Sequence, residues 1–220
     1  MKILIAIVSC RRDRTYHQLV RDTWLKDQQV DYKFFLGVDQ PGTDKLPLAE
    51  DEVFLNVSDR YTGIRDKVEK MFDWARPQDY DYVFKCDTDT FVHVPRLLKS
   101  GYEQHDWTAY QCNYGGSGYW LSKKAIEMLS KIKVVHFRED GWVGSTLIQQ
   151  GLTPFQDYRY HSDTNEGPSP ANNFITNHWY SDHNAVGADG RKYDRYIGSQ
   201  ERLSLFPKHH EEAQKIPKTG

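Results

Sequence analysis

The stretch Tyr80-Asp-Tyr-Val-Phe-Lys-Cys86 is followed without a break by Asp87-Thr88-Asp89. The first part is rich in aromatic and apolar residues, which predicts a β-strand, and the second places two carboxylates at its end. Side chains two residues apart on an extended chain point to the same face, so Asp87 and Asp89 project together. Ligands of open α/β sheets bind at the carboxyl ends of the strands, and a cation there would relieve the repulsion between the carboxylates. The pair indicates a metal site, with a solvated acidic turn as the alternative.

The rest of the chain alternates predicted strands and helices around this stretch. The segment Lys2-Ile-Leu-Ile-Ala-Ile-Val8 is almost entirely apolar, as expected of a strand buried on both faces. Further strands are predicted at 33–39 and 51–57, and helices at 15–26, 62–75, 121–132 and from about 139 onward. This alternation predicts an α/β fold with a mostly parallel sheet, flanked by helices and joined by right-handed crossovers.

Composition limits the classes of protein to consider. The 220 residues suffice for one domain with a continuous core. The net charge of −2 provides no positive field for a nucleic acid, so this class of partner is disfavoured. No apolar run approaches the roughly 20 residues of a membrane span, and Arg11 and Arg12 follow the first strand too closely for a signal peptide. The three cysteines fit a reducing compartment. We therefore expect a soluble, cytoplasmic protein of a bacterium, a virus or a host cytosol, without signal peptide or membrane anchor.

The segment Lys85-Cys-Asp-Thr-Asp-Thr-Phe-Val92 resembles the metal-binding segment of the inverting glycosyltransferases of family 31, whose pattern is Lys-x-Asp-Asp-Asp-x-Phe-Val. These are β-1,3-galactosyl-, β-1,3-N-acetylglucosaminyl- and fringe-type enzymes. Five more segments resemble motifs of this family in the same order: Arg21-Asp-Thr-Trp24, Phe34-Phe-Leu-Gly37, Tyr61-Thr-Gly-Ile-Arg-Asp-Lys67, Gly116-Ser-Gly-Tyr-Trp-Leu-Ser122 and Glu139-Asp-Gly-Trp-Val-Gly144. The sequence departs from the family at His17, Val68 and Gly141, where Arg, Thr and Val are usual.

The resemblance implies a GT-A fold, which is Rossmann-like, with a smaller mixed region on the acceptor side. It implies a single glycosyltransferase domain over residues 1–220, with a nucleotide-binding half at about 1–90, an acceptor and catalytic half at about 91–206, and a peripheral tail at 207–220. The implied activity is metal-dependent, inverting transfer of a sugar from a nucleotide-sugar, most often a UDP-sugar, to a hydroxyl acceptor such as a glycan. Alternatives are a nucleotide-sugar or glycan-binding module without turnover, and a nucleic-acid base glycosyltransferase. The sequence predicts no oligomeric state.

The resemblance also assigns residues to the chemistry. Asp89 would bind Mn²⁺ or Mg²⁺, Asp87 would contact the metal or the donor, and His178 would complete the metal site. Asp140 resembles the general base that takes a proton from the acceptor hydroxyl. The alternatives are that Asp140 only complements the dipole of a helix beginning there, and that His178 is an ordinary surface or core histidine.

The remaining predicted contacts concern the donor and the acceptor. Donor contacts are predicted at Arg11, Arg12, Lys67, Asp87, Thr88, Gly116 and Gly118. Stacking of an acceptor sugar is predicted at Tyr119, Trp120 and Trp142. The alternatives are a solvated basic turn for the arginines, a tight hairpin turn for the glycines and core packing for the aromatic residues.

Overall fold

A seven-stranded sheet forms the centre of the computed structural model, which describes residues 1–38, 47–111, 115–131, 138–160, 166–178 and 203–217. In spatial order its strands are β3 (Glu52–Ser58), β2 (Asp31–Val38), β1 (Ile3–Val8), β4 (Tyr82–Asp87), β7 (Tyr119–Ser122), β6 (Trp107–Ala109) and β8 (Phe155–Gln156). Only β7 runs antiparallel to its neighbours in this sheet. The predicted α/β class with a mostly parallel sheet is confirmed.

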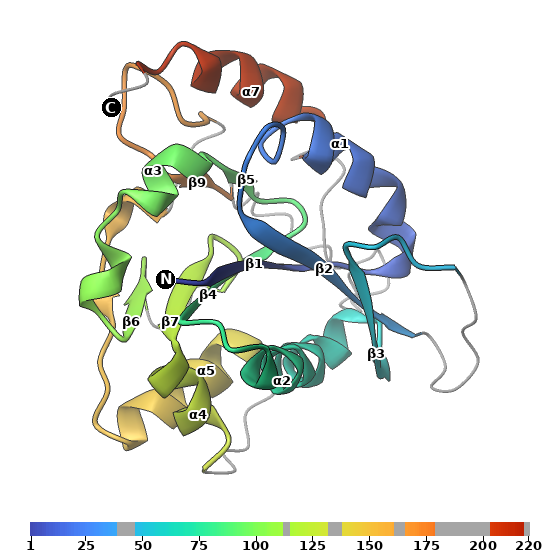
Figure 1. Cartoon of the computed structure of the whole chain (residues 1–220), viewed down its shortest axis with the longest axis vertical. Helices are drawn as coiled ribbons and strands as arrows, with labels where there is room; N and C mark the ends of the chain where they lie inside the picture. Colours follow the sequence, from blue (N-terminus) through green and yellow to red (C-terminus); the bar gives the residue numbers. More distant parts are fainter. Residues whose placement is uncertain (39–46, 112–114, 132–137, 161–165, 179–202, 218–220) are drawn as a thin grey trace, which may run out of the picture.

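Helices cover both faces of this sheet (Figure 1). On one face lie α2 (Ile64–Ala75), α4 (Lys123–Leu129) and α5 (Glu139–Gln149), and on the other α1 (His17–Asp22), α3 (Val94–Leu98) and α7 (Phe206–Gln214). The side chains of β1 alternate between the two apolar cores, which explains why this strand is apolar throughout. None of the helices in the described ranges has the length and apolar character that a bilayer span requires.

A second, two-stranded sheet lies under the C-terminal helix. Its strands β5 (Phe91–Val92) and β9 (Thr176–Asn177) pair antiparallel. Phe206 and His209 of α7 are buried against Phe91, with ring centroids 5.5 and 5.4 Å away. One residue of the predicted peripheral tail at 207–220, His209, is thus buried, because the apolar side of α7 covers β5.

Two predicted helices are shorter than their patterns indicate. The 15–26 segment begins in a 3₁₀ turn at Arg11–Tyr16 and is α-helical only in α1. The 121–132 segment begins as strand: Leu121 pairs with Val83 of β4, and the Ser122 hydroxyl accepts a hydrogen bond from the Ala125 amide at 3.1 Å, which caps α4. An apolar residue such as Leu121 fits a strand or a helix equally well, and its pairing with β4 makes it part of a strand.

Three buried histidines make the stability of the fold depend on pH. Burial lowers the pKa of His17, His93 and His209 to about 4. His17 lies between the Glu52 carboxylate, 2.8 Å from Nδ1, and the Ser9 hydroxyl, 2.7 Å from Nε2. A neutral ring that donates from Nδ1 and accepts at Nε2 satisfies both contacts.

Acidification is expected to destabilise the protein between pH 6.5 and pH 4. In this window the unfolded chain, whose histidines titrate near 6.5, binds more protons than the fold, so the free energy of unfolding falls as pH falls. Each histidine contributes a slope of about 1.4 kcal/mol per pH unit inside the window. Urea unfolding followed by tryptophan fluorescence at pH 7, 6 and 5 measures the total slope, and His17→Gln should reduce it by about 1.4 kcal/mol per pH unit. A slope that stays unchanged in this variant would contradict the assignment.

Candidate metal centre at the carboxyl edge of the sheet

The Asp87–Thr90 turn is held on the end of β1. The amide and the hydroxyl of Thr88 both donate to the Val8 carbonyl, at 3.0 and 2.9 Å, and the Thr90 amide donates to the Asp87 carbonyl at 3.0 Å. Thr88 is fully buried, and its hydroxyl faces β1. The predicted donor contact of Thr88 is therefore not seen in its side chain, which anchors the turn.

His178 reaches this turn through the pairing of β5 with β9. Phe91 pairs with Asn177, so His178, the residue after β9, comes back beside the start of β5. The side-chain amide of Asn177 donates to the Glu166 carbonyl at 2.6 Å, and the backbone amide of His93 donates to the Ile175 carbonyl at 2.8 Å. Both bonds hold the segment that leads into His178, one at Ile175 and the other at Asn177.

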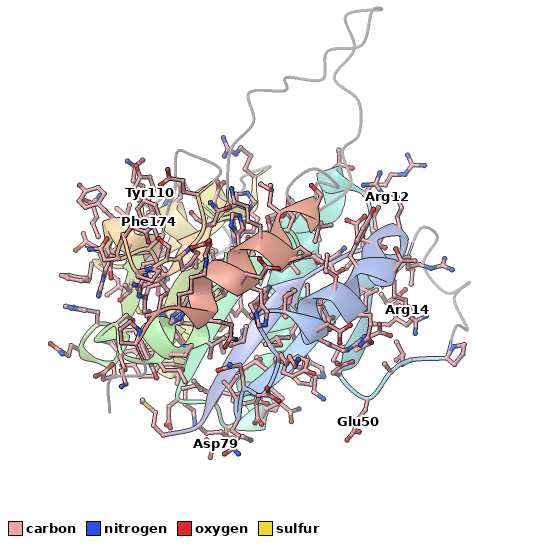
Figure 2. The ribbon with its side chains drawn as sticks, turned by 90° about the horizontal axis from the view of Figure 1, so that it is seen from above. Arg12, Arg14, Glu50, Asp79, Tyr110 and Phe174 are labelled. Atoms are coloured by element: carbon pink, nitrogen blue, oxygen red, sulfur yellow. The ribbon has the colours of Figure 1, made fainter. Side chains whose placement is uncertain are left out.

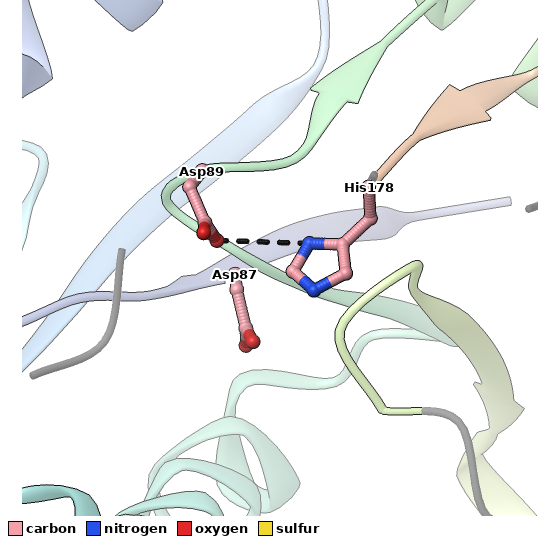
Figure 3. A group of neighbouring side chains, drawn as sticks. All are labelled: Asp87, Asp89 and His178. Atoms are coloured by element: carbon pink, nitrogen blue, oxygen red, sulfur yellow. Dashed lines mark ion pairs between the residues drawn. The ribbon is translucent and has the colours of Figure 1, made fainter. Parts of the chain in front are cut away.

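Asp87, Asp89 and His178 form a group that could hold a metal ion (Figure 3). One potential ligand atom from each lies within 4.8 Å of the others. Asp89 and His178 are 3% and 8% exposed, and His178 Nδ1 is 3.6 Å from an Asp89 carboxylate oxygen. Two carboxylates and an imidazole close together in a low-dielectric setting form a donor set suited to a divalent cation.

Thr90 determines the tautomer of His178. Its hydroxyl donates to the Gly116 carbonyl at 2.7 Å, and the same oxygen lies 3.0 Å from His178 Nδ1. Since the single hydroxyl proton is used on the carbonyl, the oxygen accepts the proton of Nδ1. In that tautomer the lone pair of the neutral ring resides on Nε2, so this nitrogen would be the one able to bind a metal.

The glycine turn at 115–118 fits between the histidine and helix α5. A Cβ atom on Gly116 would overlap the His178 ring, and one on Gly115 would overlap the Glu139 carboxylate and lie 3.2 Å from the Asp140 Cβ. Gly118 has φ +94° and lies against Phe84, so a side chain there would be both strained and crowded. Close packing thus explains why glycine occupies each of these positions. Donor contact at Gly116 and Gly118 stays a prediction.

Asp140 lies in the first turn of α5 and is 9% exposed. One of its oxygens accepts a hydrogen bond from the Arg138 guanidinium at 2.9 Å, and the other accepts one from the Gly141 amide at 2.7 Å. Its contact with the helix start agrees with the dipole interpretation. Asp140 packs against Gly115 and His178 packs against Gly116, so the two side chains flank the same short turn.

A buried lysine, Lys85, lies close to both Asp87 and Glu139. Lys85 of β4 is fully buried, and its ammonium lies 2.8 Å from an Asp87 oxygen, 3.1 Å from the Gly115 carbonyl and 3.4 Å from a Glu139 oxygen. Glu139 also accepts a hydrogen bond from the Tyr119 hydroxyl at 2.5 Å. Burial alone would lower the pKa of Lys85, but the charges of Asp87 and Glu139 outweigh it and raise this pKa.

Lys67, one of the predicted donor contacts, forms a buried ion pair. Its ammonium is fully buried, 2.5 Å from an Asp59 carboxylate oxygen and 2.5 Å from the Ser9 carbonyl. Asp59 also accepts hydrogen bonds from the amides of Gly37, at 2.7 Å, and Arg11. Lys67 and Asp59 together connect the segments that follow β1 and β3 to the end of β2, and a buried ammonium requires a nearby counter-charge of this kind. Contact of Lys67 with a donor stays a prediction.

The two arginines lie just after β1, on the edge of the sheet where the metal group lies. Arg11 is half-buried, whereas Arg12 is exposed beside the start of α1 (Figure 2). The Arg12 guanidinium lies 3.2 Å from an oxygen of Asp13, which is buried. Burial raises the pKa of Asp13, and the negative charge of Asp89 contributes a smaller effect in the same direction. Contact of either arginine with a donor stays a prediction.

The three aromatic residues predicted to stack on an acceptor are core residues. Tyr119, Trp120 and Trp142 are each at most 3% exposed. Trp120 stacks on Tyr102, with ring centroids 3.8 Å apart, and this pair fills the core on the α1 side. A sugar cannot reach faces that are covered in this way, so core packing is the role that the structure gives them.

Lys85, Thr90 and Arg138 belong to the site and were missing from the predicted residues. Lys85 had a signal in the sequence, since it lies two residues before Asp87 on a strand and hence on the same face. Arg138 adjoins Glu139 and Asp140, which offers a weaker signal. Nothing local marks Thr90, whose role depends on Gly116 and His178.

Comparison with known proteins adds no family assignment: no protein-family model matches the chain, and no curated protein matches it. The fold and the site define an α/β protein with a Rossmann-like sheet and a candidate Asp-Asp-His metal centre at its carboxyl edge.

Proposed function

We propose that the protein is a metal-dependent, inverting glycosyltransferase that moves a sugar from a nucleotide-sugar, in the first place a UDP-sugar, to a hydroxyl group of a glycan. The observation that carries the proposal is that the candidate metal group and a further carboxylate lie around one turn. The Asp87, Asp89 and His178 group flanks Gly116, and Asp140 flanks Gly115. A metal–diphosphate site and a base for the acceptor would thereby face one reaction space.

The donor set favours Mn²⁺, with Mg²⁺ as the second choice. Asp87 and Asp89 offer hard oxygen ligands that both ions accept, and the imidazole of His178 tilts the preference toward Mn²⁺. When bound, such an ion would neutralise the charge that grows on the departing nucleoside diphosphate. Arg11 and Arg12 follow β1 at the same edge, and in this proposal they would donate hydrogen bonds to phosphate oxygens.

Asp140 is proposed to act as the general base. In a single displacement the acceptor oxygen forms a bond to the anomeric carbon as the bond from that carbon to the diphosphate breaks, and the hydroxyl proton passes to the Asp140 carboxylate. Arg138 and the Gly141 amide orient the carboxylate, at 2.9 and 2.7 Å. One base suffices for this reaction, and the anomeric configuration is inverted because the acceptor attacks opposite the leaving group.

Nucleotide binding provides the first test. Thermal unfolding should be measured with UDP, GDP, ADP and CMP, each with and without Mn²⁺, followed by assay of the corresponding sugar donors for release of the nucleotide. We expect UDP to raise the midpoint by several degrees only when Mn²⁺ is present, and one UDP-sugar to be hydrolysed slowly in the presence of the metal. Mn²⁺-dependent UDP binding with no hydrolysis or transfer would favour a binding module. A protein that responds to none of these nucleotides would refute the proposal.

A further inference from the structure

Lys85 is a cation shared by two carboxylates that have different positions in the site. One of them, Asp87, belongs to the candidate metal group, whereas Glu139, 3.4 Å from the Lys85 ammonium, is not part of that group. The other carboxylate oxygen of Glu139 accepts a hydrogen bond from the Tyr119 hydroxyl at 2.5 Å. The side chains of Lys85, Glu139 and Tyr119 are all buried, so water screens their charges little.

The sharing of Lys85 determines how much negative charge Asp87 presents to a cation. Lys85 carries one positive charge, and Asp87 and Glu139 together carry two negative charges. While Glu139 takes part of the lysine's charge, Asp87 keeps a net attraction for a metal ion. Without Glu139, the whole ammonium charge is balanced by Asp87, whose oxygen is only 2.8 Å away, and the ion pair competes with the metal.

We propose that Glu139 and Lys85 are positioning residues that tune the metal affinity of the site: Glu139 shares the charge of the Lys85 ammonium with Asp87 and so leaves part of the negative charge of Asp87 to the cation. The inference rests on the metal centre of the proposed function, and it concerns residues that do not themselves belong to the metal group. Through the Gly115 carbonyl, the same ammonium also fixes the turn that separates His178 from α5.

The test is Mn²⁺ affinity in three variants, measured by titration with the free ion detected by electron paramagnetic resonance. Glu139→Gln keeps the shape of the side chain and removes its charge, and we expect Mn²⁺ binding to weaken about tenfold, the usual effect of losing a residue that supports a metal ligand. The double variant Lys85→Met with Glu139→Gln removes the competing cation as well, and affinity should return to at least the original value. Glu127→Gln makes the same charge change on the exposed side of α4 and should have no effect.

The double variant separates charge sharing from a merely structural role. If Lys85 and Glu139 only supported the fold, two buried substitutions would weaken binding more than one, and this outcome overturns the inference. Unchanged affinity in Glu139→Gln overturns it too, while leaving the metal centre intact. If circular dichroism shows that Glu139→Gln does not fold, the Mn²⁺ affinity of the double variant tests the inference by itself. The double variant should fold because it removes both charges of the Lys85–Glu139 pair. If the unchanged protein binds no Mn²⁺, the metal centre itself fails, and this inference with it.

Discussion

Asp89→Asn is expected to weaken Mn²⁺ binding by about 100-fold or more, since loss of a ligand should cost at least as much as loss of a residue that supports one. Asp89 is 3% exposed and faces His178, so its charge lies within the candidate centre. The amide has the shape of the carboxylate but no charge, so the fold should persist. Calorimetric titration with Mn²⁺, in the absence and presence of UDP, measures the effect, and circular dichroism reports on folding.

An exposed aspartate provides the control for this variant. Asp66 in α2 has a side chain that is 60% exposed, so Asp66→Asn makes the same charge change away from the site and should leave Mn²⁺ binding as it was. Equal affinities in the unchanged protein and in Asp89→Asn would remove Asp89 from the metal centre. Equal losses in the two variants would indicate a long-range effect of net charge.

Asp140→Asn is expected to reduce the rate of sugar transfer by a factor on the order of 10²–10⁴, the usual contribution of a general base. The affinity for the nucleotide-sugar should stay within about twofold, because Asp140 acts on the acceptor in the proposed reaction. Single-turnover transfer with a radiolabelled UDP-sugar measures the rate, and titration of the same donor measures affinity. An unchanged rate with normal donor binding would give the role of base to another carboxylate.

Two other carboxylates are less suited to that role: buried partners hold Glu139, and several hydrogen bonds from one guanidinium hold Asp157. Glu139 is engaged by Lys85 and Tyr119, and Asp157 accepts three hydrogen bonds from the Arg159 guanidinium, at 2.6 to 3.1 Å. Asp140, in contrast, is held through Arg138, whose side chain is about half exposed. If Asp140→Asn retains activity, Glu139→Gln and Asp157→Asn are the variants to examine next.

Several elements could be predicted from the sequence because their signals are local. An apolar stretch such as residues 2–8 can be stable only where both faces are covered, and β1 is indeed buried on both. The spacing of Asp87 and Asp89 placed both carboxylates at a strand end, and the helix beginning near Glu139 appears as α5. Lys67 shows the limit of such reasoning, because a lysine at a helix start looks exposed until its buried partner is known.

The order of residues along the chain thus determined which segments become strands and helices, and which of them end in chemically reactive side chains. Only the tertiary structure decided which of these side chains meet. His178 comes beside Asp89 because β9 pairs with β5, and Lys85 meets Glu139 because β7 and the glycine turn bring the start of α5 to the end of β4. The physical reason is one of range: periodicity reflects contacts between residues a few positions apart, whereas an ion pair between Lys85 and Glu139 depends on the packing of the whole sheet and its helices.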